Sequence, residues 1–161
     1  MNWANNTEVS AYFKALISKY KKVTITYIGE TIERNITTII NNDVSKWPIF
    51  IFEDLRGTAD GTEDTALCEN IQVAFFILYS LEIGDDAVIN ATLDKTSAIG
   101  KDFVTRIGKD IEDDVYFTLK KAAFEPVFQL EPNLYGHLIT IDFRGNLLQF
   151  DSEAWTDGDT L

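Results

Sequence analysis

The chain has 161 residues, of which 45% are hydrophobic and 25% are charged, so its composition is that of a globular protein and not of a disordered chain. Its 14 Lys and Arg residues against 26 Asp and Glu residues give a net charge of -12, which disfavours tight binding to nucleic acids and to anionic membranes. The length suits one hydrophobic core, so we expect residues 1–161 to form a single domain.

Cysteine content and the N-terminus bear on the compartment. The single cysteine, Cys68, cannot form an intramolecular disulfide, and residues 1–6 lack the basic and apolar parts of a secretory signal. The longest apolar run, Val73–Tyr79, is far shorter than the roughly 20 residues that a membrane helix needs. We therefore expect a cytoplasmic protein without a membrane span.

The N-terminal part of the chain predicts a helix followed by a strand. Apolar residues recur at helical spacing over Thr7–Lys21, and β-branched and aromatic residues alternate over Val23–Ile28. On that strand the alternation places Val23, Ile25 and Tyr27 on one face. The segment Thr31–Ile40 fits either a helix or a strand, and its threonine and asparagine content favours a strand.

The middle of the chain predicts strands separated by a loop. Ile49–Glu53 follows Pro48 and is rich in strand-forming residues, whereas Arg56–Asp64 contains two glycines and several acids and is typical of a solvated loop. Asn70–Ile83 is the strongest strand pattern. Both of its alternating faces are apolar in the middle, so we expect that part to be covered on both sides.

Beyond Asp85 and Asp86 the helical spacing returns as far as Ile111, which predicts one long helix or two helices separated near Asp94. Gly100 and Gly108 each weaken this helix by about 1 kcal/mol relative to alanine.

The C-terminal third predicts a hairpin and a tail. Tyr116–Ala123 fits a helix or a strand, whereas Phe124–Leu130 and Leu138–Phe143 flank a turn and predict two paired strands. Residues 151–161 form an acidic tail with no periodicity. The expected fold is therefore α+β: a single domain with an antiparallel or mixed sheet packed against an N-terminal helix and a long central helix.

Residue types that carry chemistry are sparse. His137 is the only histidine, so a zinc site built on a histidine pair is excluded within one chain. A Cys68–His137 dyad lacks a local signature, and a packed thiol with a half-exposed imidazole at a strand end is the better interpretation. Phosphate-binding glycine loops and calcium-loop spacing are missing from the sequence. We predict no catalytic, cofactor-binding or metal-binding residues, and hence no enzyme.

Two tryptophans stand apart from the 20 aromatic residues, most of which occupy core positions. Trp47 and Trp155 lie at the edge of a regular element or outside one, where a large amphipathic ring often anchors a partner. They are the predicted partner-binding residues. The alternatives are that these rings fold back on their own domain or that the tail around Trp155 is disordered, and for Trp155 these two together outweigh an arm that reaches a neighbour.

The order of elements carries a family resemblance. An N-terminal helix, a strand at Val23, a long strand over Gln72–Glu82, a helix after Asp85, and a hairpin from Phe124-Glu125-Pro126 to Asn133-Leu134-Tyr135-Gly136 follow one another. This pattern resembles the small neck and tail-terminator proteins of tailed bacteriophages. The resemblance implies a small α+β fold, a ring at the head–tail junction that stops growth of the tail tube, and no catalytic residues.

Two hypotheses of function follow. The first is a non-enzymatic assembly protein that forms a homo-oligomeric ring with other virion proteins of the tail or neck as partners, located in the host cytoplasm during assembly and then in the virion. The second is an acidic binding or inhibitory domain that occupies the basic surface of another protein. The mass in solution distinguishes a ring from a monomer.

Overall fold

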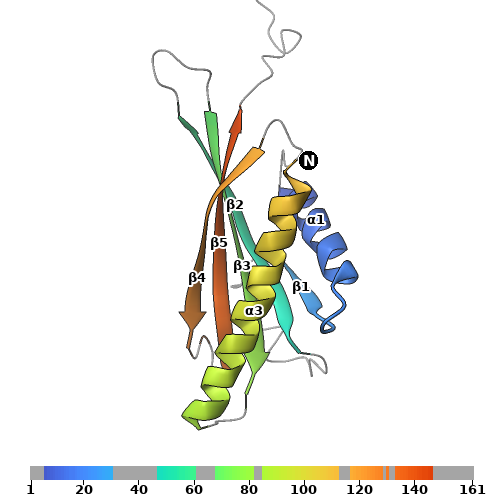
Figure 1. Cartoon of the computed structure of the whole chain (residues 1–161), viewed down its shortest axis with the longest axis vertical. Coiled ribbons are helices and arrows are strands. Elements are labelled where there is room, and N and C mark those ends of the chain that lie inside the picture. Colours follow the sequence, from blue (N-terminus) through green and yellow to red (C-terminus); the bar gives the residue numbers. More distant parts are fainter. Residues whose placement is uncertain are drawn as a thin grey trace, which may run out of the picture.

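In the computed structural model of the chain, the two helices among the described residues cover one face of a five-stranded sheet (Figure 1). The structure describes residues 6–30, 47–60, 68–81, 85–112, 117–128, 130 and 133–146. Within these ranges the elements are α1 (Asn6–Lys19), β1 (Thr26–Glu30), β2 (Ile49–Asp60), β3 (Cys68–Ser80), α3 (Asp86–Asp110), β4 (Phe117–Val127) and β5 (Leu134–Asn146). The strand order is β1-β2-β3-β5-β4, with β1 parallel to β2 and the other neighbours antiparallel. The expected α+β fold with a mixed sheet is confirmed.

Helix α1 forms because its apolar residues repeat on one side, and that side faces the sheet. Val9, Phe13, Leu16 and Ile17 are buried, as the spacing predicts, and the helix ends at Lys19, two residues earlier than expected. Val23, Ile25 and Tyr27 all pack with the apolar cluster that contains these α1 residues, as predicted, but the strand predicted over Val23–Ile28 is displaced: β1 begins at Thr26, so Val23 and Ile25 precede it. The ambiguous segment Thr31–Ile40 lies outside the described residues.

Strand β2 is longer than its sequence indicates. The prediction of a loop over Arg56–Asp64 is wrong for its first part, because Arg56–Asp60 continues β2 and pairs residue by residue with Cys68–Gln72 of β3. Pairing of the backbone with a neighbouring strand outweighs the weak strand propensity of Gly57 and Asp60. The rest of the predicted loop, 61–64, lies outside the described residues.

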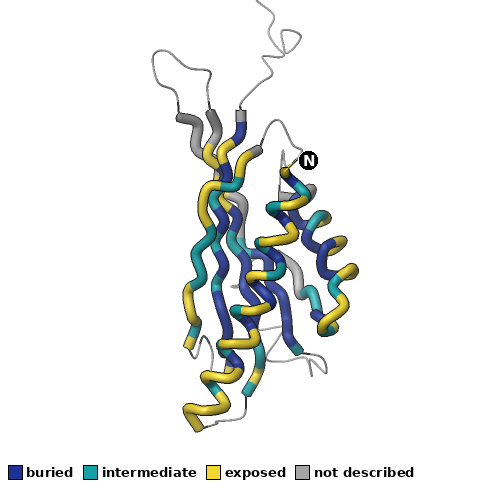
Figure 2. Tube along the Cα trace, in the orientation of Figure 1, coloured by how far each residue is buried: buried dark blue, intermediate teal, exposed yellow. Residues whose placement is uncertain are grey.

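Strand β3 has an apolar side chain on each face in its middle, as predicted. Val73, Phe75 and Ile77 belong to the cluster under the helices, whereas Phe76 and Leu78 belong to a second cluster. Figure 2 shows the buried residues running along β2, β3 and β5 and along the inner sides of both helices. Neither described helix combines the length and the apolar content that a membrane-crossing helix requires.

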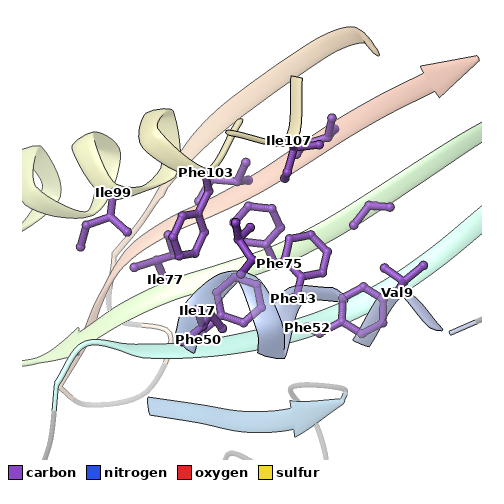
Figure 3. Packing of buried hydrophobic residues seen from close by; sticks show 14 of the residues in the cluster. Val9, Phe13, Ile17, Phe50, Phe52, Phe75, Ile77, Ile99, Phe103 and Ile107 are labelled. Carbon is purple, nitrogen blue, oxygen red and sulfur yellow. The ribbon is translucent and has the colours of Figure 1, made fainter. Parts of the chain in front are cut away.

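Phenylalanine rings form the centre of the cluster between α1, α3 and the sheet (Figure 3). The Phe50 and Phe75 rings are stacked with their centroids 4.8 Å apart, and the Phe13 ring of α1 lies 5.1 Å from Phe75. Phe103 of α3 also belongs to this group of rings, because its centroid lies 6.4 Å from that of Phe75. Aromatic pairs at such distances add about 0.5–1.5 kcal/mol each to what the buried area contributes.

Helix α3 is one continuous helix, so no break occurs near Asp94. Asp85 caps its N-terminus because its carboxylate accepts hydrogen bonds from the Ala87 and Val88 amides. Asp85 therefore has a structural role.

The last two strands form the predicted hairpin. Strand β4 begins at Phe117, which resolves the ambiguous segment in favour of a strand from that residue onward. In β5, a Cβ at Gly136 would collide with the Ile77 carbonyl oxygen, so the strands approach at a distance that only glycine permits. Strand β5 lies between β3 and β4 and ends at Asn146, and the acidic tail lies outside the described residues.

Candidate functional site

A groove lies between α1 and α3. It encloses about 340 Å³, and the buried side chains of Leu16 and Phe103 contribute to its floor. This volume is at the lower end of the range for ligand sites, roughly 300–1,000 Å³, and suits one large side chain rather than a folded element. The two helices lie side by side on the sheet in Figure 1.

Two tyrosine–aspartate hydrogen bonds join the walls of the groove. The Tyr12 hydroxyl donates to Asp110 Oδ2 at 2.9 Å, and the Tyr20 hydroxyl donates to Asp102 Oδ2 at 2.8 Å. The tyrosines are eight residues apart in the α1 region and the aspartates eight residues apart on α3, in reverse order. The helices therefore run antiparallel, and the two bonds hold them together at two levels.

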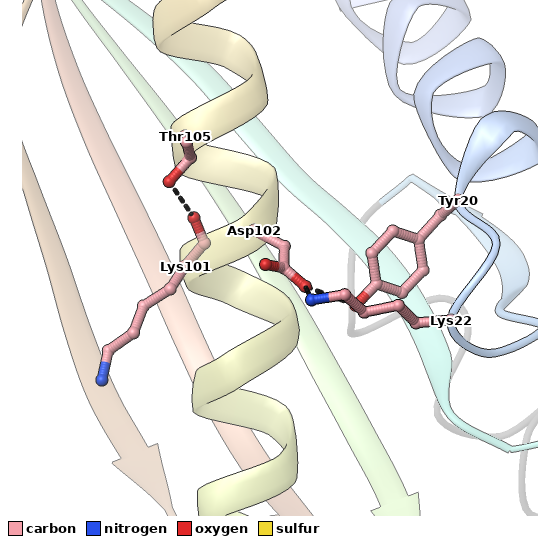
Figure 4. Close-up of polar contacts among 5 residues, drawn as sticks. All are labelled: Tyr20, Lys22, Lys101, Asp102 and Thr105. Carbon is pink, nitrogen blue, oxygen red and sulfur yellow. Dashed lines mark hydrogen bonds and ion pairs between the residues drawn. The ribbon is translucent and has the colours of Figure 1, made fainter.

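A cation accompanies each of these bonds. Lys22 Nζ donates to Asp102 Oδ2 at 2.6 Å, so this carboxylate oxygen accepts from both Lys22 and Tyr20 (Figure 4). At the other level, Arg106 Nε lies 2.7 Å from Asp110 Oδ1, one helical turn away on α3. The Lys22 and Arg106 side chains are more than half exposed, so these ion pairs position the groups and add little to stability.

The protonation states follow from this arrangement. Burial, followed by the hydrogen bonds to the two carboxylates, raises the pKa of Tyr12 and of Tyr20 above the ordinary value of 10. The hydrogen bonds from Lys22 and then Tyr20 lower the pKa of Asp102. At neutral pH the tyrosines are neutral donors and Asp102 is an anion, so the groove offers fixed polar contacts.

The rim of the groove is cationic in a strongly acidic chain. Lys19, Lys21, Lys22 and Arg106 line it, which is 4 of the 14 Lys and Arg residues, against Asp102 and Asp110, which are 2 of the 26 acids. The lining therefore carries a net charge of +2, whereas the whole chain carries -12. A site with this charge attracts acidic groups and gives them apolar contact at its floor.

The predicted partner-binding tryptophans are elsewhere. Trp47 is half-buried and packs against the second apolar cluster, which contains Ile49, Phe76 and Leu134, and its peptide bond to Pro48 is cis. Trp155 lies outside the described residues. Trp47 therefore contacts its own domain and does not line the groove.

The thiol and the imidazole of the hypothetical dyad are far apart. Cys68 pairs with Asn146 at one end of β5, whereas His137 lies nine positions earlier on that strand, a separation of about 30 Å. The interpretation of His137 as a half-exposed imidazole at a strand end is wrong. Its side chain lies under α3 and only 8% of the residue is exposed.

His137 is held by a threonine of α3. The Thr96 hydroxyl lies 2.8 Å from His137 Nδ1 and is also within hydrogen-bond distance of the Thr92 and Leu93 carbonyls. Burial, and then the nearby Lys101, lower the pKa of His137, so the buried imidazole is neutral at neutral pH.

Sequence reasoning did not find the groove, because its two walls are about 80 residues apart in the chain. The visible signal was the concentration of Lys19, Lys21 and Lys22 at the end of an amphipathic helix in an otherwise acidic chain. The described residues contain no group of three or more His, Cys, Asp and Glu side chains placed to hold a metal ion. No protein-family model and no curated protein matches the chain.

Proposed function

We propose that this chain is a non-enzymatic assembly protein whose copies join into a closed ring, as in the neck and tail-terminator proteins of tailed bacteriophages. The observation that carries the proposal is the cationic groove on a chain of net charge -12. A ring needs a head-to-tail interface, in which two different and complementary surfaces of one copy meet those of its neighbours. An acidic chain with a basic groove among its described residues provides two such surfaces.

The order of elements supports the same proposal. An N-terminal helix, the strand β1, the long strand β3, the helix α3 and the hairpin of β4 and β5 follow one another. This is the order of elements in which the sequence resembles the phage proteins. A ring at the head–tail junction also encloses passing DNA. A net charge of -12 repels phosphate and lets the DNA pass without the adhesion that Lys and Arg produce.

The mass of the full chain in solution tests the proposal. Sedimentation velocity across a dilution series should give one stable species of several copies. Raising the salt from about 0.1 M to about 1 M shortens the Debye length from about 10 Å to about 3 Å, and the ring should then dissociate more readily.

A monomer at every concentration would contradict the proposal. Tight capture of a basic protein by that monomer would favour the alternative function, an acidic domain that occupies the basic surface of a partner. The two functions are thus separated by one measurement on the free chain and one on a mixture.

A further inference from the structure

We propose that the groove between α1 and α3 binds the acidic C-terminal segment, Asp151–Asp159, of a neighbouring copy, with Trp155 on the apolar floor. The inference rests on the proposed ring and names the contact that joins one copy to the next. The groove and the segment are the two complementary surfaces that a head-to-tail interface requires.

The chemistry of the groove selects the occupant. Its floor includes Leu16 and Phe103, and the Tyr12 and Tyr20 rings stand in its walls, so an aromatic side chain gains apolar contact there. The rim carries four cations against two carboxylates, and each carboxylate already accepts from a tyrosine and pairs with a cation. Because its lining has a net charge of +2, the groove attracts additional negative charge.

The C-terminal segment has the complementary chemistry. Trp155 is flanked on each side by two acids: Asp151 and Glu153 before it, Asp157 and Asp159 after it. Four negative charges around one aromatic ring complement a groove whose lining has a net charge of +2 and whose floor is apolar. The size also matches, because about 340 Å³ accommodates one large side chain.

The chain outside the described residues has the length that such a contact needs. Strand β5 ends at Asn146, and Figure 1 shows that end of the strand beyond the ends of both helices. Trp155 is nine residues further along, so an extended chain can place it up to about 30 Å from Asn146. That reach is about the diameter of a small domain, enough to cross to an adjacent copy.

Disulfide trapping in the full chain tests which surface the segment meets. The trapping variant carries Ala15→Cys in the groove and Thr156→Cys beside Trp155, with Cys68→Ser to remove the native thiol. The matched control carries Ser18→Cys in place of Ala15→Cys. Ser18 is exposed on the same helix, three residues away, and does not line the groove.

Mild oxidation of the trapping variant should give a ladder of linked copies on a non-reducing gel, formed at least tenfold faster than in the Ser18→Cys control. Equal rates in the two variants would overturn the proposal. A single band of oxidised monomer would also overturn it, because it would mean that the segment binds the groove of its own chain.

Charge reversal provides a second measurement that does not depend on cysteines. Lys19→Glu with Lys21→Glu should raise the concentration needed for half-assembly at least tenfold, whereas Lys95→Glu with Lys101→Glu should leave it within about twofold. The control pair is exposed on α3 outside the groove, and Figure 4 shows Lys101 pointing away from Asp102. Adding Asp157→Lys and Asp159→Lys to the variant with Lys19→Glu and Lys21→Glu should restore assembly. No rescue would overturn the proposal.

The role of the Trp155 side chain is tested by Trp155→Ala. This variant should raise the concentration needed for half-assembly about thirtyfold or more, because it removes an indole that is buried in the groove. Failure of this inference is distinguishable from failure of the proposed function. A ring of unchanged mass in the Trp155→Ala and groove variants would reject the docking contact and leave the ring intact. A monomeric native chain would reject the ring itself.

Discussion

Two glycines of the same helix show how the environment of a single residue decides its effect. In the sequence Gly100 and Gly108 look alike, and each should weaken α3 by a similar amount. In the structure, a Cβ at Gly100 would lie 3.0 Å from Ile139 and Phe124, whereas a Cβ at Gly108 would meet nothing within 4 Å. Gly100 thus allows α3 to approach the sheet, and Gly108 has no such role.

We expect Gly108→Ala to raise the free energy of unfolding by about 0.5–1 kcal/mol, because alanine restricts the unfolded chain and favours the helix. Gly100→Ala should instead cost about 1–3 kcal/mol through overpacking. Urea denaturation of both variants measures the difference. Equal effects at the two positions would show that the helix does not sit on β5 as closely as described.

His137 should make stability depend on pH. Its pKa is lowered in the folded state below the ordinary value of 6.5, so the unfolded chain binds the proton more readily. The stability that the neutral His137 contributes is fully present above pH 6.5 and declines as the pH falls below 6.5. We expect the free energy of unfolding to fall between about pH 7 and pH 5 more steeply in the native chain than in His137→Gln.

Urea titrations at a series of pH values measure this dependence. The native chain and His137→Gln are compared by the slope of the unfolding free energy against pH, because the substitution also changes the stability at every pH. Lys101 lowers the pKa further and Asp94 opposes it. Asp94→Asn should therefore steepen the dependence. Parallel curves for the native chain and His137→Gln would show that the imidazole is not held neutral under α3.

At the scale of elements, the aromatic side of α1 is what fastens this helix to the sheet. Phe13 is fully buried and its ring lies close to Phe50, Phe52 and Phe75. We expect Phe13→Ala to lower the free energy of unfolding by about 3–5 kcal/mol, because it removes these contacts and leaves a cavity. Thermal or urea denaturation measures it. Ser18→Ala on the exposed side is the control and should change stability by less than about 0.5 kcal/mol.

A loss near 1 kcal/mol for Phe13→Ala would contradict the packing of α1 against β2 and β3. The same variant should also loosen the groove, whose α1 wall it supports, so assembly would weaken together with stability.

The elements differ in how far the sequence reveals them. Periodicity predicts α1, α3 and the middle of β3 because burial on one side or on both leaves a regular trace of apolar residues. The extension of β2 over Arg56–Asp60 leaves no such trace, since this stretch has no alternation of large apolar residues. It is strand because β3 supplies backbone partners. The groove is hidden for a related reason. Its floor looks like ordinary core, and its polar pairs join residues that no local pattern connects.

At the scale of the whole molecule, charge is distributed unevenly. Four cations gather at one groove, yet the net charge of -12 governs the long-range field that a polyanion meets. We expect generic duplex DNA to bind with a dissociation constant of about micromolar or weaker at about 150 mM salt, because so few phosphate contacts are available. Fluorescence anisotropy measures it, with Lys19→Glu and Lys21→Glu as the variant that removes any residual binding. Sub-micromolar affinity would show that the groove dominates over the net charge.

The position of β5 in the sheet has a consequence for biosynthesis. Of the described strands, β5 is the last to leave the ribosome, yet it lies between β3 and β4 and supplies hydrogen bonds to both. Until Asn146 has emerged, one edge of β3 has no paired strand. Helix α3 also lacks the Ile139 and Ile141 side chains, which belong to the same apolar cluster. The sheet is therefore completed only after β5 has been translated, and a ribosome stalled before β5 exposes an unpaired strand edge to chaperones and to other nascent chains.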